Sequence, residues 1–175
     1  MMTESSKSCP KVHLRALEPE DLDCLYEIEN DERLWNVGIT NVPYSKNLLL
    51  DYIMQASGDI YSDKQVRMMA ENEAGEIVGI VDLMDFSPQH NRAELGIVIK
   101  NEFRGKGYAV AVLRKIVEYA RNVIHLHQIF AIVPKSNQRC IKFLQSSDFQ
   151  QTMCLKDWLF DGKEYNDAIF FQKYL

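Results

Sequence analysis

The chain lacks the features of membrane, secreted and disulfide-rich proteins. Its 175 residues contain no apolar run near the roughly 20 residues that a membrane-spanning helix needs. The polar start MMTESSKSCP has no apolar core of the kind that a secretory signal contains. Cysteines are few, and no CxxC pair or zinc-like spacing occurs among Cys9, Cys24, Cys140 and Cys154. We therefore expect a cytoplasmic protein with no membrane partner and no bound metal.

Positive charge is also scarce. The chain has 20 Lys and Arg against 25 Asp and Glu, a formal net charge of −5. This balance argues against a nucleic-acid partner, because phosphate neutralisation needs a basic surface. The charges are unevenly placed: residues 18–33 hold eight acids and one Arg, whereas residues 101–142 hold eight Lys or Arg and two acids. This pattern would suit a protein with one cationic and one anionic ligand, although two solvated helical faces would give it too.

Hydrophobic periodicity predicts a flexible tail over residues 1–10 and one domain over residues 11–175. We expect strands at 12–17, 66–71, 77–84, 92–99, 128–133, 153–160 and 164–171, and helices at 19–30, 45–58, 107–120 and 137–144. A three-strand meander followed by strand–helix–strand predicts an α/β fold. It would have a central mixed, mostly antiparallel sheet of about seven strands, with about four helices on its two faces.

The most informative segment follows the strand at 92–99. The run Arg104-Gly105-Lys106-Gly107-Tyr108-Ala109 places two glycines and two cations before a helix. Glycines let the backbone approach a ligand, and the free N–H groups at a helix start favour an anion such as a pyrophosphate. The run lacks the ending of a Walker motif and the spacing of a dinucleotide-binding fingerprint. A bare Gly-x-Gly could also be no more than the start of a helix.

Arg104, Gly107 and Ala109 match the defined positions of the acyl-CoA signature (Arg/Gln)-x-x-Gly-x-(Gly/Ala). With its element order, the chain thus resembles the GNAT (GCN5-related N-acetyltransferase) family over residues 12–175. Five shorter stretches resemble the spermidine and diamine N-acetyltransferase group: residues 14–22, 77–83, 92–95, 126–129 and 161–167. The resemblance implies a homo-oligomeric enzyme that moves an acetyl group from acetyl-CoA to a polyamine such as spermidine, by direct attack in a ternary complex.

The resemblance also implies which residues hold acetyl-CoA. Backbone groups of Ile97, Val98 and Ile99 would hold the pantetheine arm, and a main-chain N–H of this strand would stabilise the developing oxyanion. The pyrophosphate would lie against Arg104, Gly105, Lys106, Gly107, Tyr108 and Ala109. Asn137 and Cys140 would line the opposite wall, although Asn137 could instead be a plain helix cap.

Two carboxylates, Glu94 and Asp82, are candidates for the catalytic work on the acceptor amine. They lie on neighbouring strands of an expected antiparallel pair, so they could face one groove, bind a cationic amine and relay its proton through water. They could equally be ordinary strand residues on a solvated face. The acids after the first helix, Glu29, Asp31 and Glu32, would extend the substrate-binding surface.

One position departs from the family pattern. The polyamine group has a tyrosine that can protonate the leaving thiolate, and its position here is held by Leu144. The Gly-Phe that follows this helix is altered to Asp148-Phe149. Since Leu144 cannot donate a proton, water or another group would have to do so. Two alternatives stay open: an acetyltransferase for peptide N-termini of the ribosomal-protein type, and a CoA-binding protein with impaired catalysis.

Overall fold

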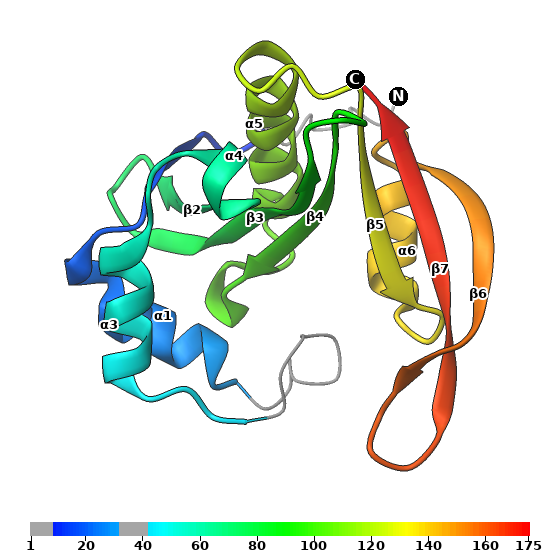
Figure 1. The fold of residues 1–175 in the computed structure, drawn as a ribbon, viewed down its shortest axis with the longest axis horizontal. Helices are drawn as coiled ribbons and strands as arrows, with labels where there is room; N and C mark the ends of the chain where they lie inside the picture. Colours follow the sequence, from blue (N-terminus) through cyan, green and yellow to red (C-terminus); the bar gives the residue numbers. More distant parts are fainter. Residues whose placement is uncertain (1–8, 32–41) are drawn as a thin grey trace, which may run out of the picture.

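The computed structural model describes residues 9–31 and 42–175, which form a mixed sheet of seven strands in the order β1-β2-β3-β4-β5-β7-β6 (Figure 1). The strands are β1 (Val12–Ala16), β2 (Val66–Asn72), β3 (Ile77–Ser87), β4 (Arg92–Ile99), β5 (Gln128–Pro134), β6 (Gln150–Phe160) and β7 (Tyr165–Tyr174). Only β4 and β5 run parallel, and every other neighbouring pair is antiparallel. The predicted α/β fold with a mostly antiparallel sheet is confirmed.

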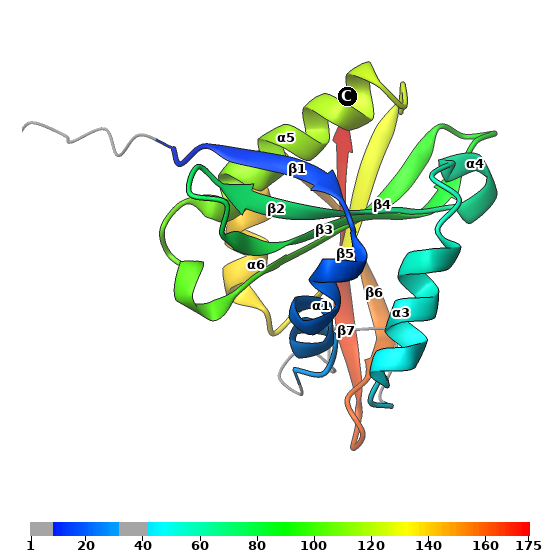
Figure 2. The same ribbon diagram turned by 90° about the vertical axis from the view of Figure 1, so that its left-hand side faces the viewer.

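Helices cover both faces of this sheet (Figure 2). Within the described residues they are α1 (Leu22–Glu29), α3 (Lys46–Gln55), α4 (Ile60–Asp63), α5 (Tyr108–Asn122) and α6 (Gln138–Gln145), with the 3₁₀ turns η1 (Pro19–Asp21) and η2 (Asn101–Phe103). The four-residue helix α4 is the one that the sequence pattern did not predict. None of the helices in this part of the chain is long and apolar enough to cross a membrane.

Alternation along β3 divides the core between the two faces of the sheet. Val81 packs in the same cluster as Val112 and Ile116 of α5. Its neighbour Ile80 points to the other face and packs with Ile28 of α1. The first face therefore buries the long helix that follows the glycine-rich segment, and the second face carries α1 and α3.

An ion-pair network fastens the start of α1 to the edge of the sheet. The guanidinium of Arg15 donates to both carboxylate oxygens of Asp21, at 2.6 and 2.8 Å, and to Glu71 at 2.5 Å. Asp21 also accepts from the backbone N–H of Glu18 at 2.9 Å. The hydrogen bond from Arg15 is the main reason that the pKa of Asp21 lies below its usual range. The stretch at 14–22 that resembles the polyamine group is thus largely explained by its structural role.

The end of α6 explains the two altered positions after Asn137. The N–H of Phe149 donates back to the carbonyl of Leu144 at 3.1 Å, and Asp148 between them has a φ of 64°. Both apolar side chains are buried in one cluster. This is the pattern of a Schellman motif, in which glycine is the usual residue at the left-handed position and an apolar pair closes the helix end. Asp148 therefore occupies a position that suits glycine better.

Asp148→Gly should raise the free energy of unfolding by about 0.5–1 kcal/mol, because glycine adopts a positive φ without a steric penalty. The side chain is exposed and its only ion pair within the described residues, to Lys173 Nζ, spans 3.7 Å, so little is lost with it. Urea unfolding monitored by circular dichroism measures the change. Asp148→Ala, which removes the same carboxylate but keeps a Cβ, is the matched control, and equal stability of the two variants would contradict the explanation.

Candidate active site

The parallel strands β4 and β5 stay together for only three residue pairs, the last of which sets Glu94 opposite Phe130. Beyond this point the two strands diverge (Figure 1). Residues 95–99 and 131–134 have no ladder partner across the fork, although each strand stays paired along its other edge. Backbone groups that face the fork can therefore bond to an extended ligand that lies between the strands.

Gly79 on β3 permits the backbone course of β4 beside the fork. A Cβ on Gly79 would lie 2.0 Å from the carbonyl oxygen of Val98. That distance is far shorter than any non-bonded contact, so every larger residue would displace β4. The glycine thereby fixes the strand whose free edge lines the fork.

The segment between β4 and α5 is a glycine-rich loop whose backbone could hold an anion (the anion-binding loop). Gly105 and Gly107 have φ values of 74° and 88°, which residues with a side chain rarely adopt. The first hydrogen bond within α5 runs from the N–H of Ala111 to Gly107 at 3.2 Å, so three N–H groups of the first turn precede it. Arg104 donates its Nε to the carbonyl of Ile99 at 2.8 Å. Its two terminal nitrogens have no acceptor within the described residues and stay available to a phosphate.

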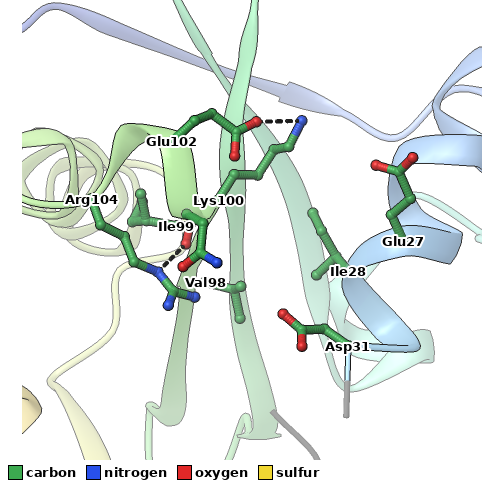
Figure 3. Close-up of a pocket in the computed structure, with 9 residues that line it drawn as sticks. Glu27, Ile28, Asp31, Val98, Ile99, Lys100, Glu102 and Arg104 are labelled. Atoms are coloured by element: carbon green, nitrogen blue, oxygen red, sulfur yellow. Dashed lines mark hydrogen bonds and ion pairs between the residues drawn. The ribbon is translucent and has the colours of Figure 1, made fainter. Parts of the chain in front are cut away.

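A hollow of about 190 Å³ lies between the end of α1 and the end of β4 (Figure 3). It is lined by Glu27, Ile28, Asp31, Val98, Ile99, Lys100, Asn101, Glu102 and Arg104. Asp31 and Arg104 stand on opposite sides of it, and Lys100 pairs with Glu102 at 3.0 Å. The hollow thus connects the acidic end of α1 with the anion-binding loop.

The start of α6 lies beyond the end of β5, the other strand of the fork. The Oδ1 of Asn137 accepts from the N–H of Cys140 at 3.1 Å, which makes Asn137 the N-cap of the helix. Its Nδ2 has no acceptor within residues 9–31 and 42–175, so it can still donate to a ligand. Burial raises the pKa of the Cys140 thiol, which keeps this group neutral. The cap that the sequence left as an alternative is observed, and it is compatible with a ligand contact.

Glu94 and Asp82 lie on the same face of the sheet. Asp82 pairs in register with Gly96, and Glu94 is two residues from Gly96 along β4, so alternation places both carboxylates on one side. Burial, and secondly the charge of Asp85, raise the pKa of Glu94. A hydrogen bond from the backbone N–H of Ile132 in the fork opposes this rise.

Arg67, which no sequence motif singled out, engages two of the candidate acids. The Nε and Nη2 of Arg67 donate to Asp82 at 2.6 and 3.1 Å, and its Nη1 donates to Glu29 at 2.5 Å. Asp82 and Glu29 are therefore ion-paired rather than free surface acids. The available signal was a cation on the strand at 66–71, but only the register shows that it faces Asp82. Glu32 lies outside the described residues.

Residues 11–150 match the family model described as the acetyltransferase (GNAT) domain. The chain belongs to the GNAT family of N-acetyltransferases. Like the family, it is an acetyl-CoA-dependent enzyme, and its fork, anion-binding loop and capped α6 fit that co-substrate. The pyrophosphate would be held by the loop and Arg104, and the pantetheine arm by the backbone of Ile97 to Ile99.

Several N-acetyltransferases align with most of this chain. The chain is 28% identical over 162 residues to spermidine N(1)-acetyltransferase of Escherichia coli K12, covering 93% of this chain and 85% of that protein. It is 25% identical over 164 residues to the putative ribosomal N-acetyltransferase YdaF of Bacillus subtilis, covering 91% and 89%. A crystal structure of spermidine N-acetyltransferase from Vibrio cholerae with CoA and spermine superposes with a TM-score of 0.84 at 24% identity, covering 94% and 95%.

Gly105→Ala should lower the affinity for acetyl-CoA about tenfold, since an alanine at a φ of 74° is strained by roughly 1–2 kcal/mol and the free loop would relax to another conformation. Isothermal titration calorimetry measures the Kd. Gly75→Ala is the matched control, because Gly75 has a φ of 76° in the β2–β3 turn and equally open surroundings. Both variants should lose stability, and an equal loss of affinity in both would show that the loop conformation is unimportant for binding.

Proposed function

We propose that this enzyme acetylates a primary amine of a polyamine such as spermidine, by direct attack on acetyl-CoA in a ternary complex. The observation that carries the proposal is the shared face of Glu94 and Asp82, which adjoins the fork where the thioester would lie. The acidic end of α1 adjoins this face, where Glu29 is ion-paired to Arg67 and Asp31 lines the hollow near Val98. A polycation would find several carboxylates there, and the names of the E. coli and V. cholerae relatives agree with such a substrate.

Glu94 is the proposed proton acceptor. The attacking amine must lose a proton, and a carboxylate with a raised pKa accepts a proton more readily than an ordinary one. The proton would reach Glu94 directly or through one water. The amine nitrogen then forms a bond to the acetyl carbon while the carbon–sulfur bond breaks, and a backbone N–H of β4 would stabilise the negative charge on the carbonyl oxygen.

The leaving thiolate receives no proton from α6 in this proposal. Leu144 is 2% exposed and packs in the core, so neither its chemistry nor its surroundings supply a donor. The thiol of CoA resembles that of cysteine, with a pKa of about 8.5, so it can leave as a thiolate and take a proton from water. A general acid typically contributes roughly 10²–10⁴-fold, and we propose that turnover is slow rather than absent.

A thiol-release assay with acetyl-CoA tests the function. Spermidine, spermine, putrescine, single amino acids and N-terminal peptides are compared at equal concentration, and we expect the polyamines to be the best acceptors. A preference for peptides would favour the second candidate, an N-terminal acetyltransferase, for which the similarity to YdaF is the supporting observation. Tight binding of acetyl-CoA without turnover of any amine would instead favour a CoA-binding protein with impaired catalysis.

Glu94→Gln should reduce kcat/KM for the amine by about 10²–10⁴-fold, because the amide cannot accept the proton. In the unaltered enzyme kcat/KM should rise with pH as Glu94 loses its proton, and this rise should lie above the usual carboxyl range because the pKa of Glu94 is raised. The variant should lack the rise. A pH profile of initial rates measures both effects, and an unchanged profile in Glu94→Gln would exclude Glu94 as the base.

Asp85→Asn is the control for Glu94→Gln, because Asp85 acts on Glu94 only by its charge. Its removal should lower the pKa of Glu94 and move the acid limb of kcat/KM to lower pH without abolishing activity. Asparagine tolerates the positive φ of 48° at this position, so the variant should fold normally. An acid limb that stays in place would show that the limb belongs to another group.

A further inference from the structure

Arg67 joins three elements on the face of the sheet that carries the two candidate carboxylates. Its side chain is only 20% exposed. Its Nε and Nη2 bond to both oxygens of Asp82, and its Nη1 bonds to Glu29 of α1. The guanidinium also lies over the ring of Tyr52 of α3, 5.6 Å from its centroid. A planar guanidinium with two parallel bonds to one carboxylate fixes the orientation of that carboxylate, which a lysine would not do.

The Asp82 carboxylate borders a stretch of β4 that has no side chain. A Cβ on Gly96 would lie 3.6 Å from Oδ2 of Asp82 and 3.2 Å from the terminal methyl carbon of Met84. Glycine at this register position lets the side chains of Asp82 and Met84 lie close over the backbone of β4. The same Oδ2 accepts the longer bond from Arg67, at 3.1 Å, and a carboxylate oxygen has room for a further donor.

We infer that Arg67 is a positioning residue of the acceptor site: its two hydrogen bonds hold the Asp82 carboxylate in place beside Gly96, so that Asp82 receives an ammonium group of the substrate while Glu94 takes the proton. The inference rests on the proposed function and divides the work between the two carboxylates.

The charged groups around each carboxylate support this division. Asp82 faces Arg67 from β2, with Glu29 of α1 behind the guanidinium and Tyr52 of α3 over it. Burial opposes the charge of Arg67, but the charge and hydrogen bonds of Asp82 together with the charge of Glu29 more than offset it, so the pKa of Arg67 lies above its usual range. Its two bonds to Asp82 fix the orientation of that carboxylate.

Glu94 has no such partner within the described residues. The charged group that acts on it is Asp85, which favours the protonated form, and the N–H of Ile132 is its hydrogen-bond donor. Glu94 is therefore the group on this face whose proton affinity is increased by its surroundings, and Asp82 is the one held in place by an arginine.

A second bridging arginine provides a matched control. Arg15 on the neighbouring strand β1 also bonds to two acids, Asp21 and Glu71, and its side chain is 27% exposed. Arg15 touches neither candidate carboxylate nor the fork. Loss of either arginine should lower stability by a comparable amount, so any difference in kinetics reports on the acceptor site.

The experiment compares Arg67→Met, Arg67→Lys, the double variant Arg67→Met/Asp82→Asn, and Arg15→Met. Steady-state kinetics with the best acceptor amine give KM for each substrate and the pH dependence of kcat/KM. Arg67→Met should raise KM for the amine about tenfold or more and leave KM for acetyl-CoA unchanged, because one ordered charged contact is lost. In Arg67→Met, the acid limb of the kcat/KM profile should move to higher pH, because the negative charge of an unpaired Asp82 raises the pKa of Glu94.

The other variants separate positioning from simple stabilisation. Arg67→Met/Asp82→Asn should keep the high KM but return the acid limb to its original pH, and Arg67→Lys should restore part of the affinity. Arg15→Met should melt at a lower temperature with unchanged kinetics. If Arg67→Met does not fold, the KM of the double variant still tests the inference. The double variant should fold more readily, because it leaves no buried Asp82 without its partner.

Unaltered KM and an unaltered acid limb in folded Arg67→Met, or an unaltered KM in the double variant, would overturn the inference while leaving the proposed function intact. The proposed function fails separately, and the inference with it, if the native enzyme acetylates no amine and its CoA-saturated form binds no spermidine by calorimetry. The two failures are distinguishable, because the proposed function is tested with the native enzyme alone and the inference is tested with the variants.

Discussion

The separation of β4 from β5 is the constraint on which the rest of this structure depends. Two parallel strands that begin as a pair and then part leave a row of backbone donors and acceptors unpaired, an arrangement that proteins tolerate only where another partner or water satisfies those groups. Here the ladder ends at Glu94, and the anion-binding loop and the start of α6 lie at the wide end of the fork. An extended pantetheine arm suits such a fork because it carries amide groups of its own.

The acidic side of the site shows how much a charge depends on its neighbours. Glu94 and Asp82 are both carboxylates on one face of two adjacent strands, yet their surroundings differ. Asp82 is bound by Arg67, whereas Glu94 is half-buried near Asp85. The first arrangement fixes the orientation of a carboxylate, and the second raises the pKa of a carboxylate. Two groups of one chemical type are thereby suited to different tasks.

The altered positions near the end of α6 also become clear in three dimensions. In the sequence, Leu144 and Asp148 stand out as departures from a family pattern. In the structure, Leu144 closes the helix end together with Phe149, and Asp148 occupies the left-handed position between them. Leu144 cannot donate a proton, but it supplies the apolar side chain that packs at this helix end.

The sequence by itself determined the element order and the mixed sheet, and it predicted the glycine-rich loop before α5, because periodicity, glycines and helix caps act over a few residues. It suggested that Glu94 and Asp82 could share one face, and the register of β3 on β4 places them there. It did not reveal the bonds of Arg67 to Asp82 and Glu29, which come from three separate segments. Only the register of β2 on β3 and the packing of α1 decide such contacts, and these depend on the whole core rather than on any local pattern.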